Sequence, residues 1–228
     1  MMPSTTKERP ILFSGPMIQT LLDGRKTQTR RAVKGTEDFD DFIRDVDPDE
    51  GPFWRFSLSD GGATQCAERD CPYGQPGDRL WVREAFIVGH RMEGGESIYC
   101  DEDGRELPET VWYRADNEEF CWTDDEGRRT ETVPWKSPIF MPRWASRLTL
   151  EITEVRVERL HEITEADALA EGCDGDCPIG YIPAYQAGPL RYHYSQVWVS
   201  INGPGSWDAN PWVWAIEFRR LDPAALRP

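Results

Sequence analysis

Basic residues are scarce in this 228-residue chain. Lysine and arginine total 26, against 41 aspartate and glutamate residues, so the formal net charge is -15 at pH 7. A surface this acidic repels long polyanions, which argues against a protein that wraps DNA or RNA along an extended face. The composition therefore predicts a small ligand as the partner and no long nucleic acid.

Long apolar runs are also missing. No stretch approaches the ~18 consecutive apolar residues of a membrane-spanning helix. The first ten residues lack the apolar segment of a secretory signal peptide. We therefore expect no membrane partner and a cytoplasmic location, where the 6 cysteines are thiols or metal ligands and not disulfides.

Residues that ligate transition metals are few or poorly spaced. The 3 histidines are scattered along the chain, at His90, His161 and His193. They support neither a histidine-based triad nor a catalytic metal. Cys66 with Cys71, and Cys173 with Cys177, form two pairs whose spacing is close to that of zinc ligands, but neither pair has the stronger two-residue spacing. Free buried thiols are the preferred interpretation, a structural zinc is the alternative, and no cofactor is expected.

The chain does contain enough apolar material for a core. Hydrophobic residues make up 39% of it, with 10 tryptophans, which indicates a folded protein. Acidic residues concentrate at 37–50 and 93–131, which we interpret as solvated surface. Just before the first of these lies the cationic segment 24–31, Gly-Arg-Lys-Thr-Gln-Thr-Arg-Arg. Such a segment in an anionic protein suggests a local pocket for a small polar ligand.

Hydrophobic periodicity predicts strands and helices without a βαβ rhythm. Strands are expected at 9–13, 79–86, 111–115, 147–157 and 212–218, and helices at 16–22, 163–172 and 189–201. The apolar phase changes near Thr153, which predicts a β-bulge. The order of these elements is typical of an α+β fold built on a small, partly closed β-barrel.

Glu84 interrupts an apolar row in the predicted strand 79–86. It falls on the same face as Leu80 and Val82. Because an unpaired buried charge is costly, either Glu84 pairs with a cation inside the fold, or the strand ends or bulges before it.

The cationic segment carries a family resemblance. Gly24, Lys26 and Arg31 fit the pattern Gly-x-Lys-x-x-x-x-Arg, and the predicted strand and helix before it, the 77–78 turn and the last strand provide the context. The chain thus resembles ASCH domains, relatives of the PUA fold. It is similar to small bacterial ASCH enzymes that hydrolyse N4-acetylcytidine, and to larger ASCH-type proteins of phages and prophages. The resemblance covers roughly 9–34, 75–86, 143–172 and 210–221. It implies one PUA-like ASCH domain over 1–228, with acidic surface insertions at about 35–74 and 87–142.

The resemblance also implies a set of catalytic residues. Lys26 and Thr29 match the lysine and threonine of those amidohydrolases, and counting along the 163–172 helix places the glutamate at Glu171. Thr29 would be the nucleophile, Lys26 the proton acceptor and Glu171 the proton donor, in the hydrolysis of N4-acylated cytosine nucleosides or bases. Arg31, Glu84 and Trp144 are candidate substrate-binding residues. The alternatives are an RNA-binding or modified-base-binding module, or a ribonuclease.

This chemistry places physical demands on the fold. A lysine accepts a proton only if its pKa falls toward neutrality, through burial or cationic neighbours such as Arg25, Arg30 and Arg31. Residues three apart on a regular strand point to opposite faces, so either Lys26 lies in a turn before the strand that carries Thr29, or the backbone kinks there. We also expect Glu84 to lie within hydrogen-bond reach of one of those three arginines, which would leave Lys26 free to lose its proton.

Overall fold

The computed structural model describes residues 6–36, 39, 41–47, 51–60, 63–89, 92–93, 96–97, 110–116, 122–123, 129–130, 135–173 and 190–222. Its centre is a five-stranded sheet. The strands lie in the order β1 (Glu8–Leu12), β6 (Arg79–Arg83), β13 (Thr149–Arg159), β14 (Trp212–Arg220) and β2 (Gln28–Ala32). β1 and β6 are parallel, and the other neighbours are antiparallel.

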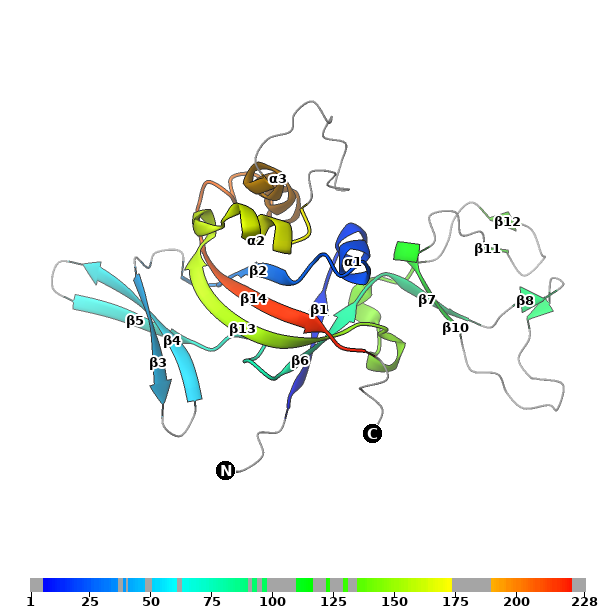
Figure 1. The fold of residues 1–228 in the computed structure, drawn as a ribbon, viewed down its shortest axis with the longest axis horizontal. Coiled ribbons are helices and arrows are strands. Elements are labelled where there is room, and N and C mark those ends of the chain that lie inside the picture. The colour runs from blue at the N-terminus through cyan, green and yellow to red at the C-terminus, as the bar shows by residue number, and fades with distance from the viewer. Residues whose placement is uncertain are drawn as a thin grey trace.

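The sheet is curved but not closed. β13 and β14 bend strongly along their length (Figure 1). No strand pairing joins the edge strands β1 and β2 within the described ranges. The register between β13 and β14 shifts between Ile152 and Glu154, which confirms the bulge expected near Thr153. The mixed α+β class is confirmed, whereas a closed barrel is not seen.

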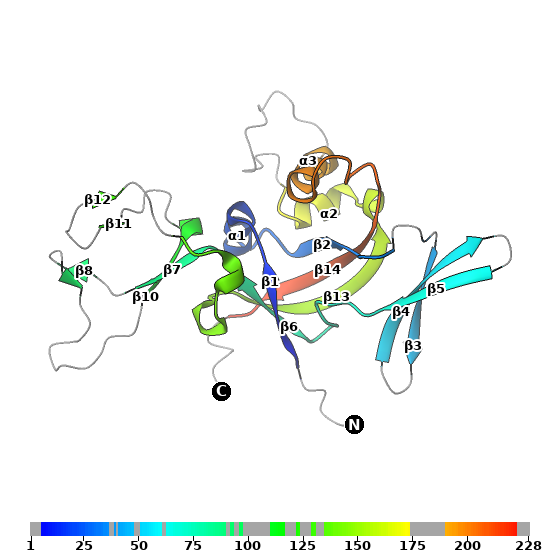
Figure 2. The same cartoon turned by 180° about the vertical axis from the view of Figure 1, so that it is seen from behind.

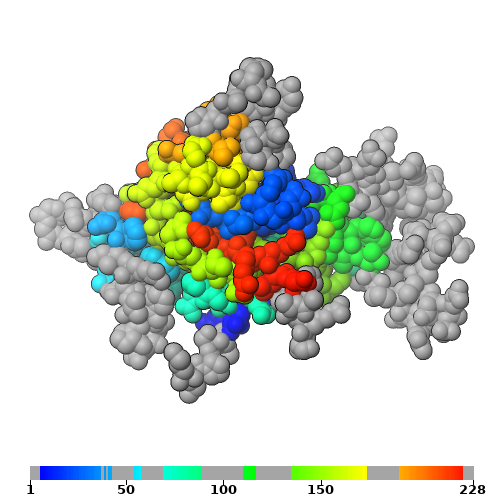
Figure 3. All heavy atoms as spheres, in the orientation of Figure 1, coloured from blue at the N-terminus to red at the C-terminus, as the bar shows by residue number. Residues whose placement is uncertain are grey.

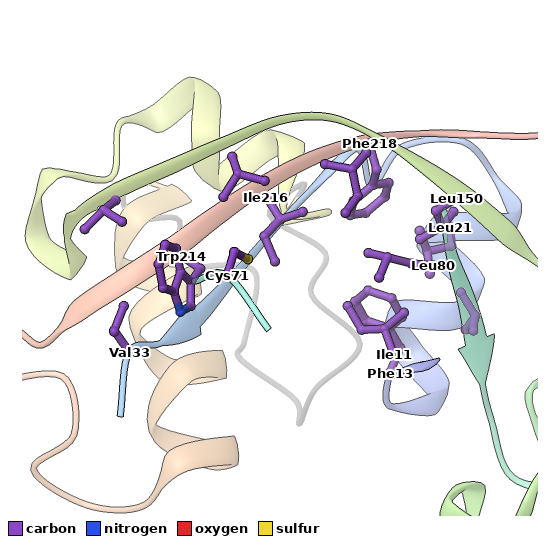
Figure 4. Close-up of a cluster of buried hydrophobic side chains, with 14 of the residues drawn as sticks. Ile11, Phe13, Leu21, Val33, Cys71, Leu80, Leu150, Trp214, Ile216 and Phe218 are labelled. Atoms are coloured by element: carbon purple, nitrogen blue, oxygen red, sulfur yellow. The ribbon is translucent and has the colours of Figure 1, made fainter. Parts of the chain in front are cut away.

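The concave side of this sheet holds the main core. Side chains of β1, β6, β13, β14 and α1 (Gly15–Leu22) converge there, and Figure 4 shows Leu80, Leu150, Ile216 and Phe218 among them. The alternation that predicted β14 explains this arrangement, since Trp212, Trp214, Ile216 and Phe218 lie on one face of the strand and all belong to this cluster.

Two further helices cover the sheet beside β2. α2 (Glu165–Ala170) and α3 (Leu190–Asn202) lie next to each other on the same side in both ribbon views (Figures 1 and 2). α3 buries Tyr194, Val197 and Trp198, as the periodicity predicts, but Ile201 is 48% exposed. The described residues also contain four 3-10 turns: η1 (Arg114–Asp116), η2 (Pro138–Phe140), η3 (Arg143–Ala145) and η4 (Leu160–Glu162). No described helix has the length and apolar content needed to span a bilayer.

The remaining strands extend from opposite ends of the central sheet (Figure 1). One end carries a three-stranded antiparallel sheet of β3 (Asp41–Asp47), β4 (Gly51–Asp60) and β5 (Ala63–Arg69). Trp54 of β4 meets Trp214 edge to face, with ring centroids 4.9 Å apart, so this sheet shares the main core. At the other end β7 (Phe86–Gly89) pairs with β10 (Thr110–Tyr113). Two short ribbons pair β8 (Met92–Glu93) with β9 (Glu96–Ser97), and β11 (Trp122–Thr123) with β12 (Arg129–Thr130).

Candidate active site

The cationic segment begins as a tight connection between α1 and β2. Gly24 ends the helix with φ +74°, a conformation that glycine adopts without strain. The backbone N–H groups of Arg25 and Lys26 then both donate to the carbonyl oxygen of Thr20, at 2.9 and 3.0 Å. β2 begins only at Gln28. Lys26 therefore lies in a turn before the strand, the first of the two arrangements expected for it.

α2 delivers Glu171 to the same place. The helix starts with a capping box, in which the Thr164 hydroxyl accepts from the Asp167 N–H. Glu171 follows its last residue, and Gly172 turns the chain with φ +92°. A Cβ on Gly172 would lie 2.8 Å from Thr20 Oγ1, so only glycine allows α2 to end this close to α1. In Figure 3 the atoms of α1 and β2 lie directly against those of α2.

Lys26 and Glu171 form a buried pair, although 145 positions separate them. Lys26 Nζ donates to Glu171 Oε2 at 2.7 Å and to the Glu171 carbonyl oxygen at 2.8 Å. The two residues are 2% and 5% exposed. A further hydrogen bond of 2.8 Å, from the Thr27 N–H to the Ala170 carbonyl oxygen, joins the two backbones beside the pair. The lysine is thus fixed on both the side chain and the backbone of the glutamate.

Burial lowers the pKa of Lys26 below its usual value, and the adjacent Glu171 only partly offsets this effect. The positive charge of Arg31 lowers the pKa further. Of the three arginines proposed as neighbours, Arg25 is exposed and its Nη2 lies 2.9 Å from Asp23 Oδ2. The exclusion of water is therefore the main cause of the lowered pKa of Lys26.

Arg30 completes the buried charge cluster. Its Nη1 donates to Gln28 Oε1 at 2.6 Å and approaches Glu171 Oε1 at 3.4 Å, while Nε donates to Glu158 Oε1 at 2.8 Å. Burial alone would lower the pKa of Arg30, but Glu171 and Glu158 outweigh it and raise the pKa. Lys26 and Arg30 thus hold different oxygens of the same carboxylate. Sequence reasoning treated Arg30 only as a neighbour of Lys26.

A pocket with an empty volume of about 360 Å³, partly open to solvent, adjoins this cluster. Six polar residues line it: Thr29, Arg30, Arg31, Glu171, Tyr194 and Asn202. Apolar side chains of α1, β2 and α3, among them Val197 and Ile201, form the rest of the wall.

Two of the three predicted catalytic residues reach this pocket. Thr29, 1% exposed, and Glu171 both line it, whereas Lys26 lies behind Glu171. The Thr29 hydroxyl makes no hydrogen bond to any residue within the described ranges, and the ammonium of Lys26 is bonded to Glu171. The structure thus joins Lys26 to Glu171 directly, and Thr29 to Glu171 through the shared pocket.

Arg31 lies where the two edge strands approach each other. Its Nη2 donates to the Leu12 carbonyl oxygen of β1 at 2.7 Å, which connects β2 to β1 through a side chain. Its guanidinium lies 5.2 Å from the centre of the Phe13 ring, and Lys26 Nζ lies 5.7 Å from the same centre. Arg31 also lines the pocket, as expected of a substrate-binding candidate.

Glu84 is buried and paired, but not with the predicted arginines. It is 3% exposed, and Arg147 binds both of its oxygens, from Nε at 2.8 Å and from Nη2 at 2.9 Å. Arg147 Nη2 also donates to Asp116 Oδ1 at 2.9 Å. The need for a cation is confirmed, and the assignment to Arg25, Arg30 or Arg31 is wrong.

The predicted partner of Glu84 is wrong because β6 ends before Glu84, whereas the sequence predicted a strand over 79–86. β6 stops at Arg83, so Glu84 leaves the alternation of the sheet, and Arg147, just before β13, reaches it. The Arg147 guanidinium also lies 4.0 Å from the centre of the Tyr113 ring. Burial raises the pKa of Glu84, although Arg147 acts in the opposite direction. These contacts fasten β10 and η1 to the central sheet, apart from the pocket.

The other sequence candidates lie elsewhere. Trp144 is 61% exposed on η3 and is not among the residues that line the pocket. Cys71 and Cys173 are buried thiols, and burial raises the pKa of Cys71 to about 11. The side chains of Cys66 and Cys177 lie outside the described residues, so the proposed zinc pairs remain untested. No group of three or more potential metal ligands occurs in the described part of the chain.

Sequence reasoning missed two further polar residues of the pocket, Tyr194 and Asn202. Tyr194 belongs to the helix expected at 189–201, and the structure places it 3% exposed in the pocket wall with Thr29 and Glu171. Helical periodicity does not distinguish a core position from a pocket wall. No model of a known protein family matches this chain, and neither a curated protein nor a solved structure matches it.

Proposed function

We propose that this protein is a cytoplasmic amidohydrolase of the ASCH type, which removes the acyl group from N4-acylated cytosine nucleosides or bases. One observation carries the proposal: Lys26 and Glu171 form a buried pair, and Glu171 shares a pocket with Thr29. These are the residue types of the ASCH amidohydrolase pattern, at the matching positions. The net charge of -15 also favours a small ligand over a polyanionic polymer.

In the acylation step, Thr29 Oγ1 adds to the acyl carbonyl carbon and gives its proton to Glu171, which passes its own proton across the 2.7 Å contact to neutral Lys26. The electrons of the C=O bond move onto the oxygen. As the tetrahedral intermediate collapses, the C–N bond breaks and Glu171 gives its proton to N4, so that the free cytosine amine leaves. Water then adds to the acyl-threonine, the carboxylic acid departs, and Thr29 recovers its proton.

The protonation states that this step needs are compatible with the buried pair. A neutral lysine with a protonated glutamate carries the same number of protons as the ion pair, with one proton moved across the 2.7 Å contact. Because burial penalises both charges, it lowers the free-energy difference between these two forms. The lowered pKa of Lys26 agrees with this.

The PUA-like barrel is part of the same proposal. The central sheet is curved, and its edge strands β1 and β2 approach each other closely enough for Arg31 to reach the Leu12 carbonyl oxygen. Phe13, directly after β1, and Phe218 of β14 lie with ring centroids 6.3 Å apart. Side chains thus fill the seam that backbone hydrogen bonds leave open.

The direct test is incubation of the purified protein with N4-acetylcytidine, with cytidine release followed by chromatography in the presence of a chelator. The wild type is expected to release cytidine. Thr29→Val keeps the shape and removes the hydroxyl, so it should lose most of the activity, while Thr29→Ser should retain part. Thr27→Val, at an exposed position two residues away, is the matched control. Unchanged activity in Thr29→Val would refute the nucleophile, and an inactive, folded wild type would refute the amidohydrolase.

RNA affinity separates this proposal from the binding-module alternative. With a net charge of -15, binding to a single-stranded RNA at physiological salt should be weak and should fall steeply as salt is added. Fluorescence anisotropy with a labelled oligonucleotide measures this. Tight binding that resists salt, without cytidine release, would favour the binding module.

A further inference from the structure

Tyr194 is held rigidly in the pocket wall. Its side chain belongs to α3 and packs between two tryptophans, with ring centroids 6.3 Å from Trp198 and 6.3 Å from Trp207. The residue is 3% exposed, yet it lines the pocket that contains Thr29 and Glu171. A tyrosine has few rotatable bonds, so this packing fixes the position of its hydroxyl group.

The hydroxyl of Tyr194 is available to a ligand. No hydrogen bond joins it to another side chain or backbone group in the part of the chain that the structure describes. Buried tyrosine hydroxyls usually have a hydrogen-bond partner, since leaving such a donor unsatisfied costs free energy. A phenol whose ring is buried and whose hydroxyl has no protein partner, at the wall of an open pocket, is suited to donate to whatever occupies that pocket.

The charges around Tyr194 favour this role. Burial raises its pKa well above the usual value, and Glu171 raises it further, while Arg30 and Arg31 act in the opposite direction. The phenol therefore keeps its proton at neutral pH and remains a hydrogen-bond donor. The same two arginines favour negative charge that develops next to the phenol.

The proposed reaction still needs a hydrogen-bond donor that stabilises negative charge on the acyl oxygen of the substrate. When Thr29 adds to the acyl carbon, the carbonyl oxygen becomes an oxyanion, and donors aimed at that oxygen usually provide a large part of the rate enhancement. Lys26 is bonded to Glu171 behind the pocket, and Glu171 serves the leaving nitrogen. We infer that Tyr194 is a further catalytic residue, whose hydroxyl donates a hydrogen bond to the acyl oxygen of the substrate as the tetrahedral intermediate forms. The proton stays on Tyr194 throughout, and the inference rests on the proposed amidohydrolase function.

The first experiment removes only the hydroxyl. Tyr194→Phe keeps the ring between the two tryptophans, so thermal stability should change little. Loss of one oxyanion donor is expected to lower kcat by about 10²–10³-fold, with a much smaller change in KM for N4-acetylcytidine. Tyr192→Phe, on the same helix and 47% exposed, should have wild-type kinetics. Wild-type kcat in Tyr194→Phe overturns the inference and leaves the proposed function standing, while an inactive wild type removes both.

A second measurement separates hydrogen bonding from packing. N4-thioacetylcytidine carries sulfur in place of the acyl oxygen, and sulfur is a weak hydrogen-bond acceptor. In the wild type, the ratio of the kcat values for the oxygen and sulfur substrates should include the lost hydrogen bond, and in Tyr194→Phe this ratio should fall. If Tyr194→Phe is slow with both substrates and the ratio is unchanged, the tyrosine acts only through packing and the inference is overturned.

Discussion

Replacing Lys26 by methionine tests the energetics of the buried pair. Methionine keeps most of the length of the stem and removes the ammonium group. The side chains of Lys26 and Glu171 are 0% and 2% exposed, so water does not replace the lost partner. Removing one member of a buried ion pair costs about 3–5 kcal/mol, because the other charge is left uncompensated. Arg30 Nη1, at 3.4 Å from Glu171 Oε1, compensates partly, so we expect a loss near the lower end of that range.

The double variant distinguishes a pair from two independent side chains. Lys26→Met with Glu171→Met replaces both charges by apolar groups of similar volume, and such replacements of buried pairs are often neutral or stabilising. Arg30 keeps Gln28 and Glu158 as partners. The double variant is therefore expected to be more stable than the Lys26→Met single variant, which corresponds to a coupling energy of at least about 2 kcal/mol.

Urea unfolding followed by tryptophan fluorescence compares Lys26→Met, Glu171→Met and the double variant with the wild type, since the chain has 10 tryptophans. For a protein of this size a loss of 1 kcal/mol lowers Tm by roughly 2–4 °C, so Lys26→Met should melt about 10 °C below the wild type. Additive losses in the double variant, with no coupling energy, would refute the interaction on which the site is built.

Two further substitutions test the surroundings of the site. Burial raises the pKa of Glu84 above its usual 4.5. The folded protein therefore holds the carboxyl proton of Glu84 more tightly than the unfolded chain does. As pH rises from 4.5 through the folded pKa, the stabilising contribution of Glu84 is lost. Urea titrations at several pH values should therefore show the wild type most stable relative to Glu84→Gln below pH 4.5, and a difference independent of pH would contradict this. Gly172→Ala should cost about 1–3 kcal/mol and lower the rate, because the added Cβ meets Thr20 Oγ1 at 2.8 Å. Gly24→Ala has a similar positive φ but open space around the Cβ, so an equal loss in thermal melts and cytidine release would show that strain alone matters.

The local elements of the fold were predictable because short-range patterns determine them. Gly24 ends α1, Thr164 and Asp167 cap α2, and the change of apolar phase near Thr153 marks the bulge in β13. Each of these signals lies within a few residues of the feature that it predicts. Pairing between the edge strands β1 and β2, which would close the sheet into a barrel, involves segments far apart in the sequence, and periodicity within a strand carries no information about it.

Contacts between distant segments were predictable only in part. The burial of Glu84 and its need for a cation follow from the apolar row around it, whereas its partner depends on β6 ending at Arg83, which brings Arg147 within reach. The approach of Lys26 to Glu171 across 145 positions was expected from the family resemblance alone. Trp144 lies next to Arg143 and near Arg147 in the sequence, which made it a candidate for substrate binding, but the 3-10 turn η3 leaves it 61% exposed.

The position of one proton connects the stability of the site to its chemistry. In the ion pair, Lys26 carries the proton and is unable to act as a base. In the neutral pair, Glu171 carries it, and both residues have the forms that the proposed amide hydrolysis needs. The side chains of Lys26 and Glu171 are 0% and 2% exposed, so the pair is already shielded from water. Under the proposed function, a substrate in the adjoining pocket adds to this exclusion of water, which favours the neutral pair. The burial that makes the Lys26–Glu171 pair costly to break thus also favours proton transfer from Lys26 to Glu171 when the pocket is filled.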